Sequence, residues 1–329
     1  MNRLHPPDGF HHRSPTIDDA PAVASLIAAC QQADIGKPEM TTEELLQDWH
    51  GIDLSEEAVV VVDGAGRIVG SADILNRSYV SVSVYGYVHP EHRGRGVGRF
   101  LVDWGEQWAG DRMNLAPPDA RVSVRHYVLA SHASARALIE GAGYLPVRGV
   151  YVMEIDLLAS PEPRWPEGIM VRTFIPGQDE RAAFETHEDA FRDHWGRPPG
   201  TFERFLSMTQ QPEFDPTLWF LASDRGELAG VTLAKTVAGR GWVEGVGVRR
   251  PWRGRGLALA LLQHAFAAFH ERGVRNVGLS VDAESLTGAP RVYDRAGMRV
   301  TQSYVIHEKE LRTGVDLGMQ RESGASGAS

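Results

Sequence analysis

The same short phrase occurs twice in this chain, and its repetition constrains the fold more than any other feature. Residues 88–101 read VHPEHRGRGVGRFL, and residues 248–261 read VRRPWRGRGLALAL. Val88 therefore corresponds to Val248 and Gly96 to Gly256, at a spacing of 160 residues. Each copy predicts a strand, a turn rich in glycine and arginine, and a helix. A strand–turn–helix unit that recurs at one spacing predicts two copies of one fold.

The turn in each copy has the composition of an anion-binding site. Glycines adopt backbone angles that other residues avoid, and they leave no Cβ to obstruct a ligand. Successive N–H groups of such a turn, together with the N-terminus of the following helix, favour a phosphate. The chain has no Gly-Lys-Ser/Thr and no Gly-x-Gly-x-x-Gly here, which excludes a P-loop and a dinucleotide fingerprint. A plain surface turn explains one copy, but two copies in the same context favour pyrophosphate binding.

The turn resembles the acetyl-CoA-binding motif of the GNAT N-acetyltransferase superfamily, Arg-x-x-Gly-x-Gly/Ala after a strand. The first copy ends this motif with Gly98 and the second with Ala258. The layout is similar to that of mycothiol synthase-like tandem GNAT proteins. The resemblance implies an α/β (α+β) protein with two tandem GNAT folds, each a mostly antiparallel central sheet flanked by helices, and acetyl-CoA as co-substrate. The residues implied to bind acetyl-CoA are Val88, Arg93, Gly94, Arg95, Gly96, Val97 and Gly98, with Val248, Arg253, Gly254, Arg255, Gly256, Leu257 and Ala258.

The composition agrees with two globular domains and argues against several other classes. The chain has 329 residues, of which 42% are apolar. Its net charge of −9 argues against nucleic-acid binding, which needs a broad basic surface. The single cysteine, Cys30, lies in an alanine-rich stretch and is expected to be a small buried residue without a disulfide. Because no apolar run approaches about 18 residues, we expect a soluble, cytoplasmic protein without membrane contacts.

The repeat extends through both halves of the chain. Gly70 corresponds to Gly230 at the spacing of 160 residues. Further along, Gly143, Glu154 and Leu157 correspond to Gly297, Glu308 and Leu311 at a spacing of 154 residues. Between the halves, the proline-rich stretch 160–166 predicts a stiff linker. We predict an N-terminal, degenerate GNAT domain at residues 1–162, a C-terminal, catalytic one at residues 163–313, and a disordered tail at residues 314–329.

Tyr293 stands where the resemblance implies a general acid. GNAT proteins often protonate the leaving thiolate with a tyrosine in a Tyr-x-x-x-Gly-Phe-like phrase, and residues 291–298 read RVYDRAGM. Met298 replaces the usual aromatic residue. In the first half Ile139 holds the corresponding position and cannot donate a proton. This asymmetry predicts chemistry in the second half, and a first half that binds CoA without turnover or serves structurally. The alternative is that Tyr293 only packs.

Glu244, on the strand before the second turn, is the candidate general base. An alkyl ammonium ion, with a pKa of about 10, must lose a proton before the amine can attack. Glu244 precedes Val248 by four residues, which predicts both side chains on one face of the strand. The first half has Val84 there, and the alternative is that Glu244 is a solvated edge residue. By resemblance, Gly245 and Gly247 flank a bulge where two strands splay, and the N–H of Val248 stabilises the oxyanion.

Residues 187–197 occupy the region where this fold builds its acceptor pocket. Within it, Asp193, His194 and Trp195 are the predicted substrate-binding residues, because they offer polar groups and an aromatic surface. Acidic residues in this region indicate a cationic acceptor. The alternative is that Trp195 packs against the end of a helix. No residues have the spacing of metal ligands, so we expect no metal.

These features together predict an acetyl-CoA-dependent N-acetyltransferase. The acetyl group would pass to a small-molecule amine by direct attack, because Cys30 lies outside the predicted site and offers no covalent intermediate. Mycothiol synthase activity itself, transfer of a longer acyl chain, and a non-catalytic acyl-CoA-binding sensor or regulatory protein remain alternatives. Two similar halves can pack against each other, so a monomer is favoured over a homodimer.

Overall fold

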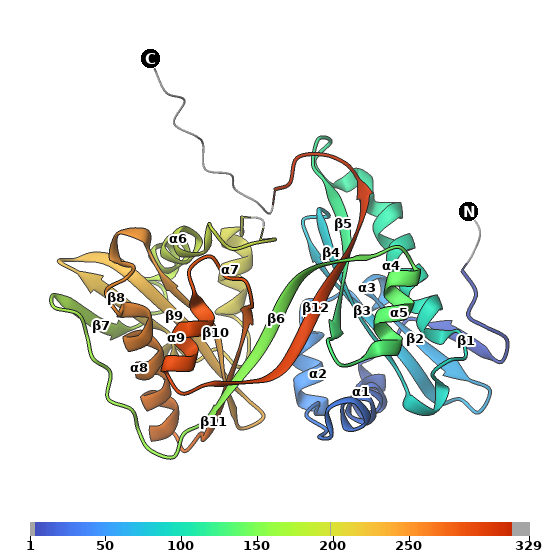
Figure 1. Cartoon of the computed structure of the whole chain (residues 1–329), viewed down its shortest axis with the longest axis horizontal. Helices are drawn as coiled ribbons and strands as arrows, with labels where there is room; N and C mark the ends of the chain where they lie inside the picture. The colour runs from blue at the N-terminus through green and yellow to red at the C-terminus, as the bar shows by residue number, and fades with distance from the viewer. Residues whose placement is uncertain (1–3, 198, 318–329) are drawn as a thin grey trace. The chain divides into compact units, whose positions relative to one another are not determined.

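The computed structural model describes residues 4–197 and 199–317, and the chain divides into two compact units. Unit 1 consists of Met1–Arg148 and Tyr304–Asp316, and unit 2 consists mainly of Gly149–Ser303. In each unit, helices flank one sheet of six strands (Figure 1). This is the predicted α/β architecture of two similar folds in tandem.

The sheet of unit 1 has the strand order β1-β2-β3-β4-β5-β12. All of these strands pair antiparallel except β4 and β5, which are parallel. Asp63 closes the turn between β2 and β3, because its carboxylate accepts hydrogen bonds from the N–H groups of Ala65 and Arg67. The strands are β1 (Phe10–Arg13), β2 (Ala58–Asp63), β3 (Ile68–Arg77), β4 (Ser81–Val88), β5 (Val122–Leu129) and β12 (Arg299–Arg312).

Helices cover both faces of the unit-1 sheet. On one face α4 and α5 bury Leu101 and Ile139, and on the other α1 and α2 pack with Leu45 and Trp49. Thr41 and Glu44 form a capping box that begins α2. The helices are α1 (Ala20–Ile35), α2 (Thr42–Asp48), α3 (Leu54–Glu57), α4 (Val97–Arg112) and α5 (Ala133–Gly141), with short 3₁₀ helices at Ile17–Asp19, Pro90–His92 and Met113–Leu115.

The sheet of unit 2 has the strand order β6-β11-β10-β9-β8-β7. Here β10 and β11 form the parallel pair and the other neighbours are antiparallel. The topology therefore repeats that of unit 1. The strands are β6 (Leu145–Asp156), β7 (Ile169–Thr173), β8 (Phe220–Asp224), β9 (Glu227–Val237), β10 (Arg240–Val248) and β11 (Asn276–Asp282).

The helices of unit 2 likewise bury two apolar clusters. Leu261 and Phe266 of α8 pack in the larger cluster, together with partly buried residues of α9. On the other face of the sheet, Phe205 of α7 packs with Trp219. The helices are α6 (Glu180–Phe191), α7 (Phe202–Met208), α8 (Leu257–Glu271) and α9 (Ala289–Arg295), with 3₁₀ helices at Pro216–Leu218 and Arg250–Trp252.

The boundaries between the two units differ from the predicted one between residues 162 and 163, because of the strands that close each sheet. The strand β6 precedes this boundary but pairs with β11 of unit 2, and the residues of β12 from Tyr304 onward pair with β5 of unit 1. Each sheet thus takes its closing strand from the segment predicted for the other domain. In the predicted tail 314–329, Val315 forms a bridge with Ala120, whereas residues 318–329 lie outside the described residues.

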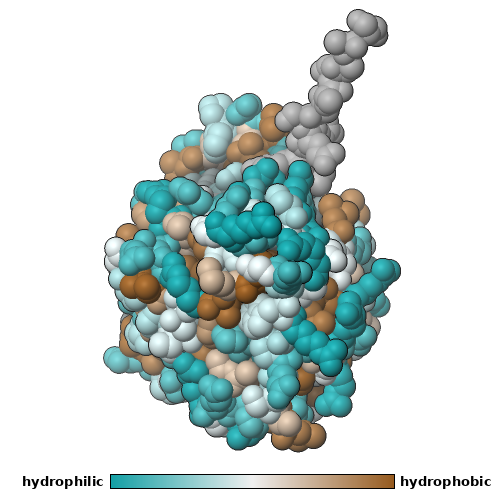
Figure 2. Space-filling model, turned by 90° about the vertical axis from the view of Figure 1, so that its left-hand side faces the viewer, coloured by the Kyte–Doolittle hydropathy of each residue, from teal (hydrophilic) through white to brown (hydrophobic). Residues whose placement is uncertain are grey.

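No helix among the described residues is long and apolar enough to cross a membrane. On the side of the molecule shown in Figure 2, hydrophobic residues are scattered among hydrophilic ones. Isolated apolar residues of this kind are usual on a surface that faces water.

Candidate functional site

The glycine turn of unit 2 leaves open space before α8. Gly254 and Gly256 have φ values of +75° and +86°, which only glycine adopts without strain. A Cβ atom built on either residue would have no other atom within 4 Å. The helix makes its first backbone hydrogen bond from Ala260 to Gly256, so the N–H groups of Leu257 and Ala258 have no helical partner. The turn therefore offers N–H donors beside an open surface, as a phosphate requires.

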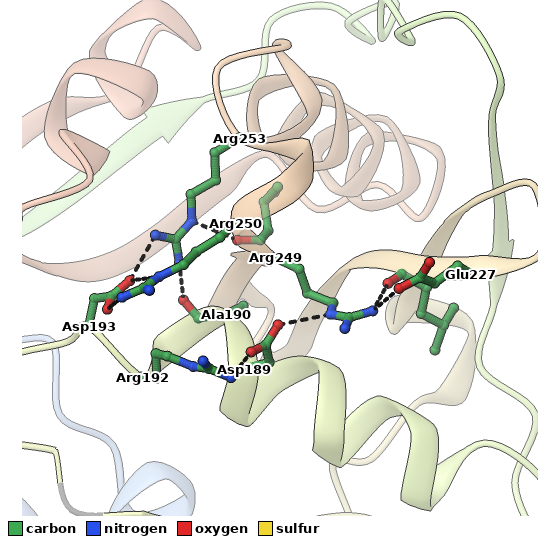
Figure 3. A network of polar contacts seen from close by, with 10 residues as sticks. Asp189, Ala190, Arg192, Asp193, Glu227, Arg249, Arg250 and Arg253 are labelled. Carbon is green, nitrogen blue, oxygen red and sulfur yellow. Dashed lines mark hydrogen bonds and ion pairs between the residues drawn. The ribbon is translucent and has the colours of Figure 1, made fainter. Parts of the chain in front are cut away.

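Buried and charged contacts hold this turn in place. Trp252 is 8% exposed and donates a hydrogen bond from Nε1 to Asp224 at 3.0 Å. Arg249 donates to Asp189 on α6 at 2.8 Å and to Glu227 on β9 at 2.9 Å (Figure 3). The position of the turn is thus fixed by the strand β9 and the end of α6.

The two arginines expected to bind phosphate also hold the turn. Arg253 donates to the carbonyl oxygens of Val248 and Ala190 and pairs with Asp193 at 2.9 Å (Figure 3). Arg255 pairs with Asp224 at 3.2 Å. The guanidinium groups thus contact carboxylates and carbonyls of the protein. The backbone of the turn is the part that is left open to an anion.

The corresponding turn of unit 1 is covered. Gly94 and Gly96 have φ values of +73° and +86°, which match those in unit 2. A Cβ on Gly96, however, would lie 2.7 Å from Cγ of Pro7. Arg93 forms a two-fold ion pair with Asp34 at 2.8 Å. The two turns share a backbone conformation but differ in access. The neighbouring residues predicted to bind acetyl-CoA, Val88, Arg95, Val97 and Gly98, lie in this covered turn and at the ends of β4 and α4.

The parallel strands of unit 2 separate beyond a bulge, as predicted. Strand β10 pairs with β11 only at Gly241 and Trp242, although both strands continue. The register of β10 with β9 shifts between Val243 and Gly245, which makes Glu244 the extra residue. The strands thus separate and a bulge is present, but the bulge lies at Glu244, just before Gly245, and not between Gly245 and Gly247 as expected.

Helix α6 packs closely against Gly245 and Gly247 of strand β10. A Cβ on Gly247 would lie 2.9 Å from Cβ of Ala190 and 3.0 Å from the ring of Phe191. A Cβ on Gly245 would lie 3.2 Å from the same ring. These glycines thus let α6 pack directly on the backbone of β10.

Glu244 is exposed and pairs with Lys235 on β9, with its carboxylate 2.6 Å from Nζ. Val248 is 8% exposed and belongs to the apolar cluster beneath α8. The prediction that these two side chains share a face is wrong, because the bulge at Glu244 interrupts the two-residue alternation of the strand. Glu244 is therefore open to a substrate that approaches from solvent.

Tyr293 lies on α9 and is half-buried against the core of unit 2. Burial raises the pKa of its hydroxyl to about 12, so it stays protonated at neutral pH. The corresponding residue of unit 1, Ile139 on α5, is 5% exposed and packs in the core. Met298, which replaces the expected aromatic residue, is 1% exposed, as is its counterpart Tyr144. The position of Met298 is therefore one of packing.

His187 on α6 lies beside the bulge in the structure. The sequence had placed it in the acceptor-pocket region 187–197 without giving it a role. Its Nε2 atom lies 3.6 Å from the position of a Cβ on Gly245. Burial lowers the pKa of His187, and the carboxylate of Glu244 is among the charges that act on it. Arg197 donates to Nδ1 at 3.1 Å, so the proton of the neutral ring lies on Nε2. His187 thus presents an N–H donor, which sequence spacing alone could not reveal.

A cavity of about 380 Å³ opens beside α6 and the loop that follows it. Aromatic and charged side chains line it together. The predicted substrate residues lie next to it but do not line it: Asp193 pairs with Arg250 and Arg253, which holds the pKa of its carboxyl at about 2, while His194 is exposed and Trp195 half-buried. The lining residues are Phe184, Glu185, Glu188, Asp189, Phe191, Arg192, Arg197, Pro199 and Gly200.

One group of possible metal ligands occurs among the described residues, His89, Glu91 and His92 in unit 1. Both ring nitrogens of His92 face arginines, Nδ1 at 3.0 Å from Arg95 and Nε2 at 3.4 Å from Arg67. Two neighbouring guanidinium groups disfavour a further cation at this place.

Comparison with protein families gives two matches. The Acetyltransferase (GNAT) family matches residues 181–298, and an Acetyltransferase (GNAT) domain matches residues 55–144. The first match includes the open turn and Tyr293, and the second includes the covered turn.

Similar proteins match over most of the chain. A mycothiol acetyltransferase of Streptomyces coelicolor is 32% identical over 77% of this chain and 77% of its own length. A mycothiol acetyltransferase of Thermobispora bispora is 31% identical over 86% of this chain and 93% of its own. Among solved structures, a GCN5-related N-acetyltransferase from Sphaerobacter thermophilus is 56% identical, covers 95% of this chain and 99% of its own, and has a TM-score of 0.87. A tandem GNAT protein from the clavulanic acid biosynthesis pathway shares the fold, with a TM-score of 0.71 at 18% identity, over 93% of this chain and 100% of its own.

Proposed function

Because this chain belongs to the GNAT acetyltransferase family, we propose that unit 2 transfers the acetyl group of acetyl-CoA to a small-molecule amine by direct attack. The chain is an acyltransferase with two GNAT domains in tandem, and acetyl-CoA is the co-substrate of such enzymes. Beyond this family activity, the proposal specifies that the reaction takes place in unit 2 and that the acceptor is a small-molecule amine.

The difference between the two units carries this proposal. Unit 2 combines an open glycine turn at Gly256 with a protonated hydroxyl at Tyr293. Unit 1 has Pro7 over Gly96 and the buried, inert Ile139 at the position of the tyrosine. Among residues 4–197 and 199–317, those suited to bind a pyrophosphate and to protonate a leaving group therefore occur together in unit 2 alone.

The reaction needs one proton removed and one supplied. The neutral amine attacks the carbonyl carbon of the thioester, the carbonyl oxygen becomes negative, and a C–N bond forms. The C–S bond then breaks, and Tyr293 gives its proton to the thiolate of CoA. The amine nitrogen loses a proton, which Glu244 accepts. The oxyanion would be stabilised by the N–H of Val248.

Glu244 is better suited than His187 to accept the proton. The Nδ1 atom of His187 accepts a hydrogen bond from Arg197, so neither nitrogen of the neutral ring is left as a base. The carboxylate of Glu244 is exposed and lies on the bulge where the strands separate. We assign His187 the role of positioning the substrate, through its Nε2–H group beside the bulge.

For the acceptor we propose a small amine that enters beside α6. The cavity there is lined by the carboxylate of Glu185 and the aromatic rings of Phe184 and Phe191, which suits a cationic group next to an apolar one. The other two carboxylates, Glu188 and Asp189, already pair with Arg197 and Arg249. The curated relatives are named mycothiol acetyltransferase, so mycothiol acetyltransferase activity is the narrower candidate function for this chain. Fold and family do not determine the acceptor.

The test is release of free thiol from acetyl-CoA in the presence of a panel of primary amines. In Tyr293→Phe we expect kcat to fall by about 100-fold, because the thiolate leaves without its proton donor. Tyr151→Phe is the matched control, because Tyr151 also packs against the core of unit 2 and should retain nearly full activity. Full activity of Tyr293→Phe together with loss of activity in Gly96→Glu would place the reaction in unit 1 and overturn the proposal.

A further inference from the structure

One face of the unit-1 sheet has a group of polar side chains at strand positions that hold leucine and glycine in unit 2. Asp73 on β3 pairs directly with Tyr85 on β4, and Tyr87 points to the same face two residues on. The ring of Tyr127 on β5 stacks on that of Tyr85, with centroids 5.4 Å apart and an interplanar angle of 19°. At the repeat spacing, the first three residues correspond to Leu233, Gly245 and Gly247 in unit 2.

These side chains lie where the parallel strands of unit 1 separate. Strands β4 and β5 pair from Ser81 to Val84 only, although β4 continues to Val88. Tyr85 and Tyr87 belong to the part of β4 beyond this pairing. Asp73, Tyr85, Tyr87 and Tyr127 are all partly exposed, so a molecule from solvent can reach them.

The polar atoms of this group have few partners in the described part of the chain. The carboxylate of Asp73 makes no ion pair there, and the hydroxyls of Tyr85, Tyr87 and Tyr127 make no hydrogen bond. The indole N–H of Trp49, a residue that is 3% exposed, is the donor next to Asp73. The carboxylate and the three hydroxyls are therefore open to a ligand that approaches this face of the sheet.

The charges around Asp73 favour a cation at this place. Burial raises the pKa of Asp73 to about 7, and the neighbouring Asp48 on α2 adds a like charge. The other titratable groups that face the cluster are Arg77 on β3, Tyr85 and Tyr87 on β4, Tyr127 on β5 and Tyr304 on β12. A bound cation would compensate the two carboxylates, which no described side chain does for Asp73.

We propose that Asp73, Trp49 and the three tyrosines form a second ligand site of this protein, specific for an organic ammonium ion. The carboxylate supplies the charge, and the tyrosine rings attract a cation over their faces. A metal ion fits less well, because Asp73 belongs to no group of three or more possible metal ligands among the described residues. The site is independent of the reaction proposed for unit 2.

Calorimetric titration with benzylamine at pH 7 tests the proposal, with benzyl alcohol as the uncharged ligand of the same shape. Titrations in two buffers of different ionisation enthalpy measure protons released on binding. We expect benzylamine to bind and to release up to about half a proton, because a cation lowers the pKa of a carboxyl that is half protonated at this pH. Benzyl alcohol should bind at least about ten-fold more weakly and release no proton.

Two variants and one control test whether the heat of benzylamine binding comes from this site. Asp73→Asn and Tyr85→Leu should each weaken benzylamine binding at least ten-fold, and Asp73→Asn should abolish proton release. Asp8→Asn, which removes an exposed carboxylate of unit 1, should bind as the wild type does. Circular dichroism verifies the fold of each variant, and either one suffices if the other fails to fold.

Equal binding of amine and alcohol, or unchanged proton release in Asp73→Asn, would overturn the proposal. The titrations contain no acetyl-CoA and require no turnover. They can therefore fail while acetyl transfer in unit 2 holds, and they can succeed while it fails.

Discussion

At the scale of single residues, Asp73 makes the stability of unit 1 depend on pH. Its pKa rises from 3.8 to about 7 on folding, mainly because burial disfavours the charged form. Between these two values the native state binds more protons than the unfolded state. The free energy of unfolding therefore falls as the pH rises from about 4 to 7, and the loss is complete above pH 7.

We expect Asp73→Asn to remove this pH dependence. The variant should be more stable than the wild type at pH 8 by about 4 kcal/mol, and nearly equal to it at pH 4, since one pKa unit is worth about 1.4 kcal/mol. Urea denaturation at both pH values measures the difference. Other groups also titrate in this range, so the quantity to compare is the variant minus the wild type. If the difference in unfolding free energy between variant and wild type were the same at both pH values, Asp73 would not have a raised pKa in the folded protein.

The sequence predicted the backbone conformation of the glycine turns better than the contacts of their arginines. Arg253 and Arg255, which were expected to bind a phosphate, pair with Asp193 and Asp224. An arginine next to a glycine turn is compatible with either partner, and the carboxylates are distant in sequence. The position of Tyr293 followed from the repeat, whereas the tautomer of His187 depends on a contact that no spacing reveals.

At the scale of elements, the two turns differ in what surrounds them. Gly96 and Gly256 have the same φ of +86°, so replacement of either places a side chain in the same strained conformation. The charge of Gly256→Glu would lie where the pyrophosphate is expected. We predict at least about 100-fold weaker binding of acetyl-CoA, because like charges at an interface cost several kcal/mol.

Calorimetric titration of acetyl-CoA measures this difference. Gly96→Glu should leave the affinity unchanged and displace Pro7 from the turn of unit 1, and the wild type should bind one equivalent per chain. Gly256→Ala has the same backbone strain without the charge and should lose far less affinity than Gly256→Glu. Two equivalents in the wild type, reduced to one by each glutamate variant, would show that unit 1 also binds CoA.

The bulge in β10 shows where strand periodicity stops being informative. Alternation placed Glu244 and Val248 on one face, but the extra residue shifts the register at that point. A bulge leaves little trace in a single sequence, because its residues are those of an ordinary strand. The order of strands and helices was predictable because the repeat gives each element twice.

At the scale of the whole molecule, the sequence shows two copies of one fold but not which segment closes each sheet. The closing strands β6 and β12 correspond in the repeat, through Glu154 and Glu308. Both glutamates meet an arginine of the sheet that they join, Arg240 in unit 2 and Arg125 in unit 1. Either strand thus has the chemistry to close either sheet, and only the three-dimensional structure shows the exchange.

This exchange predicts that the end of the chain stabilises its beginning. A chain ending at Ser303 loses the residues that pair with β5, and Arg125, 6% exposed, loses the carboxylate of Glu308 at 2.6 Å. Without this ion pair and the backbone hydrogen bonds between β5 and β12, unit 1 should open while unit 2 keeps its fold. Hydrogen exchange should show fast amides in β5 and slow ones in β9 and β10, with a chain ending at Leu317 as the control. Equally slow exchange of β5 in both chains would mean that unit 1 closes its sheet without β12.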